Sequence, residues 1–309
     1  MSISEQSTSV GVPHVVPLRG QVEAWRIDWF NLYGVITYHA LTVLAFTPWF
    51  FSWYGLAFAL VGHYTIGLLG VNLCYHRLLT HRSFECPRWL EYPLAIIGIF
   101  CGQDTPAYWV AAHRRHHQFA DDQELDPHTP LRSFMWAHMG WVLYKSDTMQ
   151  RAALTRRYAP DLLRQPFYAW LEQHWVMVMQ IGITVIFAAG FAVGWLSGLA
   201  TADAAMMGIE FVLWGIVVRI VVTWHCTWLV ASVSHKWGYR NYDTREESRN
   251  NWVVALLNHG EWHNNHHAHP ASAMLGHRRW EVDPAWWVIR LFAALGLARN
   301  IVTPPPGRG

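Results

Sequence analysis

The sequence predicts an all-α integral membrane protein built on two transmembrane hairpins, four spans in all, with helical regions on one side of the membrane. The first observation is that residues 31–75 contain no Lys, Arg, Asp or Glu. The second is that residues 174–218 contain only Asp203 and Glu210. A hydrocarbon core about 30 Å thick needs about 20 apolar residues per helix, so each segment is long enough for two spans.

The composition supports the same class. Hydrophobic residues make up 52% of the 309 residues, charged residues only 14%, and tryptophan alone occurs 20 times. The formal net charge is +2 with histidine neutral, so nothing indicates a nucleic-acid partner. The four cysteines, Cys74, Cys86, Cys101 and Cys226, form no C-x-x-C pair, which favours reduced structural thiols over an iron–sulfur cluster or structural zinc.

Each hairpin divides into two spans at a turn without Lys or Arg. The expected spans are Leu32–Phe50 and Gly55–Tyr75 in the first hairpin (31–75), and Trp175–Leu196 and Met206–Leu229 in the second (174–230). Region 76–173 is rich in arginine, so the positive-inside rule places it in the cytoplasm. Four spans return the chain to its starting side, so we expect segments 1–30 and 231–309, and both termini, to be cytoplasmic. Segment 1–30 does not resemble a cleaved signal peptide.

Two shorter apolar pieces complete the map. Tyr92–Phe100 is too short to span a membrane and is expected to form an interfacial or re-entrant helix. Pro284–Ile301 has Arg290 and Arg299 among apolar residues, which is typical of an amphipathic helix lying on the membrane surface.

One histidine spacing occurs twice, in "AAHRRHHQFADD" and in "EWHNNHHAHP". Each stretch places histidines at i, i+3 and i+4, which on a helix puts three imidazoles on one face. Such a face can present ligands to one metal or to two neighbouring metals. His76 and His81 are five residues apart, about 140° round an ideal helix. They can share a face only if the helix ends or distorts between them; otherwise they serve different metals.

Nine histidines fall on the predicted cytoplasmic side and form a candidate metal site: His76, His81, His113, His116, His117, His235, His263, His266 and His267. Nine imidazoles exceed what one metal accepts, so two metals are expected. Imidazole suits Zn, Cu, Fe and Ni, so the ligand type alone does not choose between them. Six further histidines are expected to be surface or hydrogen-bonded core residues: His14, His39, His63, His138, His174 and His225.

A membrane metal transporter or metal-storage protein is the alternative from a different class. That function needs polar ligands near the bilayer midplane. The spans offer little there except His39, His63 and Gln180, because the histidine clusters lie at the span ends. The sequence therefore favours an enzyme.

Six motifs in order resemble those of the membrane fatty acyl desaturases, especially the delta-9 type: "HRLLTHRSF", "WVAAHRRHH", "DPHTP", "HMGW", "GYRNYD" and "WHNNHH". The resemblance runs from about Tyr75 to the C-terminal amphipathic helix. It implies a di-iron centre that uses O2 and two external electrons to form a cis double bond in a saturated acyl chain. The implied iron ligands are the nine histidines above. A related di-iron hydroxylase or ketolase is the closest alternative.

The sequence departs from the family pattern in three places. Ala231 stands four residues before His235, where animal members have Asn. The third histidine box reads "HGEWHNNHH" and is one residue shorter than the usual form that follows Gly-Glu-Gly. Ala111, Ala112 and Ser146 replace charges that suit CoA in animal members, which favours an acyl-lipid substrate over acyl-CoA.

The resemblance also implies partners and supporting residues. The chain has no Gly-rich nucleotide loop and no cysteine cluster, so we expect an external electron donor of the ferredoxin or cytochrome b5 type, with its reductase. This donor is expected to dock on the arginine-rich face. Asp121, Asp126 and Glu261 are candidates to accept the second N–H of a ligating histidine, whereas Glu124 is expected in a solvated loop. An apolar tunnel for the acyl chain is expected near Tyr108–Trp109, Trp141–Tyr144 and Trp262.

Overall fold

The computed structural model describes residues 25–146 and 149–305, and they are mostly helical. Residues 1–24, with His14 and most of the expected N-terminal segment, lie outside the described part. The elements are β1 Arg26–Ile27, α1 Trp29–Ala45, α2 Trp53–Ile66, η1 Gly67–Thr80, α3 Arg88–Ile99, α4 Pro106–Phe119, η2 Trp136–Gly140, α5 Trp141–Leu143, β2 Tyr144–Lys145, α6 Arg151–Tyr158, α7 Pro160–Leu163, α8 Pro166–Leu196, α9 Thr201–Val212, η4 Leu213–Val218, α10 Arg219–Ser232, α11 Trp252–Leu257, α12 His263–Ala268 and α13 Pro284–Ala294. The η elements are π-helical, and β1 pairs antiparallel with β2.

Within the described residues, three continuous helices are long and apolar enough to cross a membrane. They are Trp53–Thr80 (α2 and η1), Pro166–Leu196 (α8) and Thr201–Ser232 (α9, η4 and α10). Their positions correspond to the second, third and fourth expected spans. The first expected span corresponds to α1, which has 17 residues and is not among the three.

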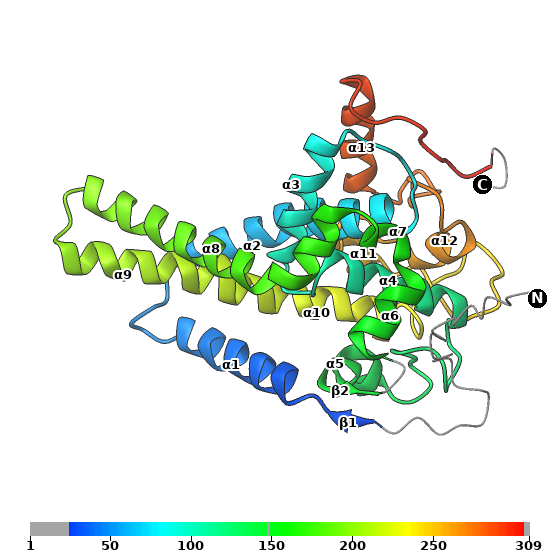
Figure 1. Ribbon diagram of the computed structural model, residues 1–309, viewed down its shortest axis with the longest axis horizontal. Helices are drawn as coiled ribbons and strands as arrows, with labels where there is room; N and C mark the ends of the chain where they lie inside the picture. Colours follow the sequence, from blue (N-terminus) through cyan, green and yellow to red (C-terminus); the bar gives the residue numbers. More distant parts are fainter. Residues whose placement is uncertain (1–24, 147–148, 306–309) are drawn as a thin grey trace, which may run out of the picture.

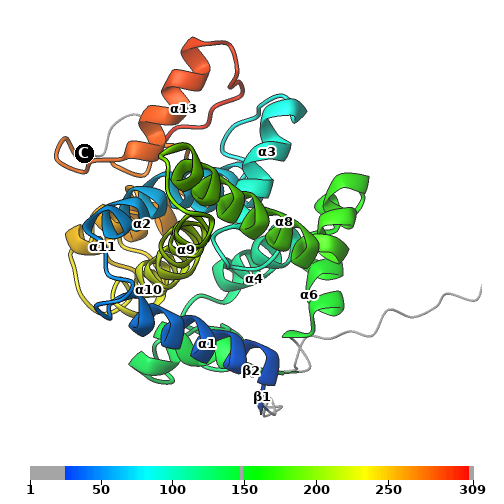
Figure 2. The same cartoon turned by 90° about the vertical axis from the view of Figure 1, so that its left-hand side faces the viewer.

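The long helices place the histidine-bearing segments at one end of the molecule. In Figure 1, α8 and α9 extend to the left as a pair, whereas α4 and α12 lie at the right. Figure 2 looks along this pair and shows α1, α2 and α10 gathered beside it. Apolar side chains of α8, such as Ile181 and Val185, are exposed, as expected for a surface that contacts lipid. The fold therefore separates an apolar end from an end that is rich in polar side chains.

Helix starts that position the polar end follow simple capping rules. Thr105 caps α4 by accepting a hydrogen bond from the Tyr108 amide, and Pro106 occupies the first helical position. Asp283 caps α13 in the same way, with Pro284 following it. The expected amphipathic helix is shorter than predicted: α13 ends at Ala294, and Gly296 with φ of 71° lets the chain turn away.

Most polar residues expected to be structural do have structural partners. All four cysteines are free and buried. His63 Nδ1 lies 3.0 Å from Thr223 Oγ1, and His225 lies between His39 and His138 with nitrogen–nitrogen distances of 2.9 and 3.0 Å. These histidines tie helices together, which agrees with a hydrogen-bonded core role.

Candidate metal centre

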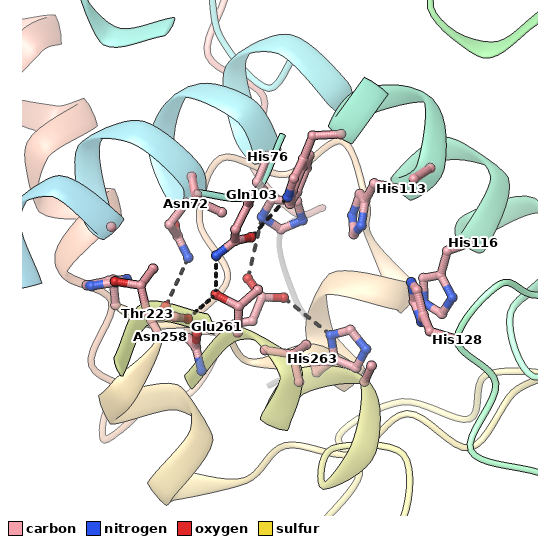
Figure 3. A pocket seen from close by; sticks show the side chains of 18 of the residues that line it. Asn72, His76, Gln103, His113, His116, His128, Thr223, Asn258, Glu261 and His263 are labelled. Carbon is pink, nitrogen blue, oxygen red and sulfur yellow. Dashed lines mark hydrogen bonds and ion pairs between the residues drawn. The ribbon is translucent and has the colours of Figure 1, made fainter. Parts of the chain in front are cut away.

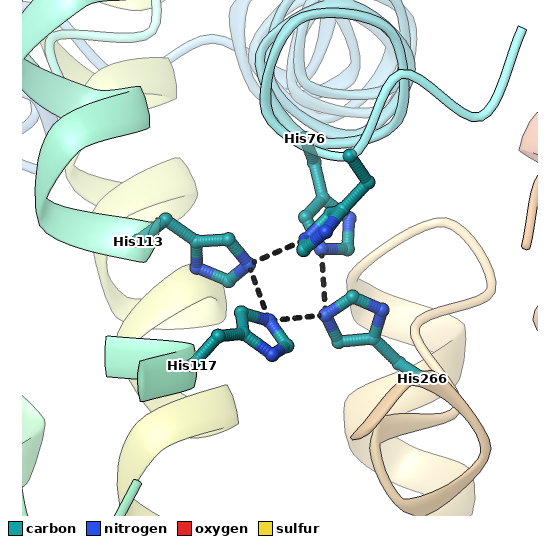
Figure 4. Close-up of side chains that lie close together, drawn as sticks. His76, His113, His117 and His266 are labelled. Atoms are coloured by element: carbon teal, nitrogen blue, oxygen red, sulfur yellow. Dashed lines mark hydrogen bonds between the residues drawn. The ribbon is translucent and has the colours of Figure 1, made fainter. Parts of the chain in front are cut away.

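Five histidines from three elements converge on one point, and we call them the five-histidine cluster: His76, His81, His113, His117 and His266. Each histidine contributes one ring nitrogen, and these five nitrogens all lie within 4.8 Å of one another. His266 contacts two other members of the cluster. Its Nε2 lies 3.0 Å from Nε2 of His76 and 2.7 Å from Nε2 of His117. Figure 4 shows four of these rings pointing toward one another from η1, α4 and α12.

A second group lies beside the first, and we call it the four-histidine cluster: His116, His235, His263 and His267. His235 follows the end of α10, and its Nε2 lies 2.9 Å from Nε2 of His263. His116 Nε2 lies 3.3 Å from Nε2 of His267. The two clusters together contain all nine histidines that the sequence singled out.

Each triplet divides between the two clusters. The i and i+4 histidines of α4, His113 and His117, belong to the five-histidine cluster, whereas His116 belongs to the other. The third box is reversed, because its i and i+4 histidines belong to the four-histidine cluster and His266 crosses to the first. Of the two possibilities left open by the spacing, the structure shows the one with two neighbouring groups.

A change of helical winding brings His76 and His81 to the same cluster. The His81 amide donates to the His76 carbonyl at 3.1 Å, which is an i+5 to i bond and therefore a π turn. Their ring centroids are 4.9 Å apart. η1 ends at Thr80, so His76 lies on its last turn and His81 just beyond it, and the structure places both histidines in one cluster.

Carboxylates contact the outer ring nitrogens of His76 in the five-histidine cluster and of several histidines in the four-histidine cluster. His116 Nδ1 donates to Asp126 at 3.0 Å. His235 Nδ1 lies 3.0 Å from Asp121, as the sequence allowed. Glu261 contacts both clusters, with distances of 3.4 Å to His76 Nδ1 and 3.3 Å to His263 Nδ1. With Nδ1 occupied in this way, Nε2 is free to face inward, an arrangement typical of metal-binding histidines.

The site keeps most of its imidazoles neutral, which is the form that binds metals. Burial holds the pKa of several of these histidines well below the usual range: His81, His113, His117, His263, His266 and His267. His116 differs: burial lowers its pKa, but the Asp126 carboxylate more than compensates, so its pKa is raised.

Two residues at the site were missed by sequence analysis. Glu246 is buried and lies 3.6 Å from His267 Nδ1, although its surroundings in "DTREES" look like a solvated loop. His128, in "DPHTP", has its ring centroid 4.2 Å from that of His116. Burial lowers the pKa of His128 to about 3, so it is neutral. No spacing pattern marks either residue.

A cavity of about 140 Å³ lies against both clusters. His76 and His113 of one cluster and His116 and His263 of the other form part of its wall. Gly67, Val71, Tyr108, Trp109, Ala112, Trp141 and Val230 supply apolar or small lining residues. In Figure 3, Asn72, Thr223 and Asn258 lie at one end of the lining and His116 and His128 at the other.

Three of the aromatic residues expected in a tunnel wall, Tyr108, Trp109 and Trp141, do line the cavity. Trp262 and Tyr144 do not. Trp262 packs on Trp252 in a separate buried group and donates to the Val282 carbonyl, whereas Tyr144 belongs to strand β2. Ala231, at the position of the family's Asn, is part of the lining.

The fold and site define a helical membrane protein with a histidine-rich centre, and comparison with known proteins identifies its family. A model of the fatty acid desaturase family matches residues 47–301. An sn-2 palmitoyl-lipid 9-desaturase of Nostoc sp. (strain 36) is 40% identical over 293 residues, which cover 94% of this chain and 95% of that protein. An sn-1 stearoyl-lipid 9-desaturase of Anabaena variabilis is 39% identical over 278 residues, covering 89% and 94%.

An acyl-CoA 5-desaturase of Anemone leveillei is also similar, at 38% identity over 287 residues that cover 92% of this chain and 82% of that protein. The chain therefore belongs to the fatty acid desaturase family. It is a fatty acyl desaturase, as the ordered motifs predicted.

Proposed function

We propose that this desaturase uses O2 and two iron ions to introduce a cis double bond near the middle of a saturated acyl chain, at the delta-9 position. The observation that carries the proposal is the pair of adjacent imidazole clusters beside one cavity. The names of the Nostoc and Anabaena relatives support the position of the bond.

The donor set fits two redox metals. The five-histidine and four-histidine clusters would each hold one iron through Nε2 atoms, with Asp121, Asp126 and Glu261 orienting the rings. Two bound irons would supply the oxidising power to break unactivated C–H bonds with O2, which acid–base side chains cannot do. Zinc has no redox chemistry and would be an inactive substitute.

The protein itself would position the acyl chain and exclude water during the reaction. Desaturation breaks two C–H bonds and reduces O2 to water, taking two electrons from the acyl chain and two from the external donor. The cavity would hold the chain against His76 and His263 and exclude bulk water from the reacting carbons. Gln103 stiffens the wall: it accepts from Trp109 Nε1 at 3.2 Å and donates to Thr227 at 2.8 Å.

We infer that the acyl chain is carried on a membrane lipid. The relatives at 39% and 40% identity are named as acyl-lipid enzymes. Alanine carries no charge, so neither Ala111 nor Ala112 offers one to CoA. In this chain Ala111 is fully buried and Ala112 lines the cavity. Ser146 is buried as well. Acyl-CoA is the close alternative, as the name of the Anemone relative illustrates.

We also propose that the clusters and both termini lie on the cytoplasmic side, with α1 completing four spans. The arginine content of region 76–173 supports this orientation. A reporter fused after residue 305 should be active only in the cytoplasm, and one inserted at the Ser197–Ala200 turn only on the other side. The reverse pattern would contradict the orientation.

Expression in a host that lacks its own desaturase tests the function. Fatty-acid analysis by lipid class should show cis delta-9 bonds appearing first in membrane lipids. Bonds appearing first in the acyl-CoA pool would overturn the acyl-lipid assignment. Hydroxylated chains without double bonds would replace desaturation by the related hydroxylase chemistry.

A further inference from the structure

The cavity extends from the two clusters into the candidate membrane span. Gly67 and His76 both line it, and they are nine residues apart on one continuous helix, Trp53–Thr80. The cavity therefore runs along η1 from His76 at the clusters to Gly67 at the start of that element. Thr223 and Ala231 also both line the cavity, and they are eight residues apart on α10. We call the end formed by Gly67, Asn72, Thr223, Asn258 and His259 the inner end.

The inner end is polar, although an apolar chain would be expected to point into it. Asn72 and His259 are only 6% and 4% exposed. Asn72 Oδ1 and His259 Nε2 are nevertheless both buried without a hydrogen-bond partner among residues 25–146 and 149–305. Buried polar atoms almost always have a protein or water partner. Asn72 and His259 both line the same cavity, so their two unpaired atoms indicate a hydrogen-bonding occupant at this end.

Hydrogen bonds to backbone carbonyls and close packing hold this wall in place. The side-chain amide of Asn72 donates to the Asn258 carbonyl at 3.0 Å, and the side-chain amide of Asn258 donates to the Cys226 carbonyl at 2.7 Å. His259 has a φ of 60° and packs so closely on Gly67 that a Cβ there would lie 2.7 Å from its ring. Its ring also contacts Tyr64, with centroids 4.8 Å apart. The polar atoms cannot turn away to find other partners without moving the wall.

We propose that the inner end binds water on Asn72 Oδ1 and His259 Nε2, and that this hydrated end limits the length of acyl chain that the enzyme accepts. The inference rests on the proposed function, because the cavity must be the acyl site. A chain long enough to reach the inner end would have to displace the water and leave both polar atoms unpaired. Shorter chains end before it and leave the water in place.

Asn72→Leu tests the proposal, because leucine has a similar size, suits a helix and removes the acceptor. Asn31→Leu is the matched control: Asn31 also donates to a single backbone carbonyl at 3.0 Å, that of Val142, but lies outside the cavity. Both variants would be expressed in a desaturase-deficient host supplied with saturated chains of graded length. The conversion of the first poorly used longer chain, relative to the best substrate, should rise at least threefold in Asn72→Leu only. An unchanged length profile in an active Asn72→Leu variant would overturn the proposal.

A second measurement does not depend on turnover. An experimental density map of the full-length wild-type protein in lipid nanodiscs should show a water peak within hydrogen-bond distance of Asn72 Oδ1 and His259 Nε2. A dry inner end, or a lipid methyl group seated against Asn72, would refute the inference. If the wild type forms no double bonds in any chain, the proposed function fails and the limit on chain length fails with it, whereas the density still decides whether the inner end binds water.

Discussion

At the scale of single residues, His266 and His267 are neighbours in the sequence but belong to different clusters. We therefore expect His266→Ala and His267→Ala each to lower the iron content from about two to about one per chain and to abolish desaturation. The physical reason is that each change removes one imidazole from one coordination shell and leaves the other shell complete. Metal analysis of the purified variants measures this, and full turnover in either variant would contradict the ligand assignment.

His269→Ala provides the control for that experiment. His269 lies two residues further along and contacts Tyr242 and His277, not the clusters. Its substitution should leave the metal content at the wild-type value. A loss of metal in this variant would indicate that the alanine changes act through misfolding of α12.

Glu261 contacts histidines of both clusters, and it is the one carboxylate to do so among residues 25–146 and 149–305. Burial raises its pKa to about 8, and cationic metals on either side would favour its charged form. We expect Glu261→Gln to weaken metal binding roughly 10- to 100-fold, because the orientation of His76 and His263 is lost. Competition with a chelator measures the change. Glu85→Gln, at an exposed ion pair with Arg299, should retain wild-type resistance to the chelator.

At the scale of elements, a buried ion pair joins the membrane helix to the C-terminal helix. Arg77 of η1 contacts Asp283, the cap of α13, at 2.8 Å, and the two side chains are 1% and 3% exposed. Arg77→Met should destabilise the protein by about 3–5 kcal/mol, because an unpaired carboxylate remains buried. Thermal unfolding in detergent should show a clearly lower midpoint, whereas Arg299→Met, at an exposed pair, should change it little. Equal midpoints for the two variants would contradict the assigned role.

At the scale of the whole molecule, we expect the protein to receive electrons from an external donor. The purified protein supplied with NAD(P)H alone should form no double bonds, and a ferredoxin or cytochrome b5 type donor with its reductase should restore activity. If docking depends on arginines of region 76–173, the rate with the donor should fall as salt rises, because exposed charges are screened. Desaturation with NAD(P)H alone would refute the need for a partner.

Much of the architecture could be predicted because apolar length and histidine spacing are local properties. The positions of α8 and of the Thr201–Ser232 helix follow from runs without charge, and α4 and α12 follow from the histidine spacing. The first expected span, Leu32–Phe50, corresponds to α1, which already ends at Ala45. The helix ends there because Pro48 and the aromatic turn follow it. Glu246 could not be predicted, since its burial depends on contacts with distant segments.

The sequence by itself determined the class of the protein, the set of nine histidines and the family, because these are read from composition, spacing and ordered motifs. Only the tertiary structure decided how the histidines divide between two clusters, that His76 and His81 meet through a π turn, and that the cavity ends on Asn72 and His259. The physical reason is distance along the chain. His76 and His266 are 190 residues apart, so their meeting depends on how whole helices pack.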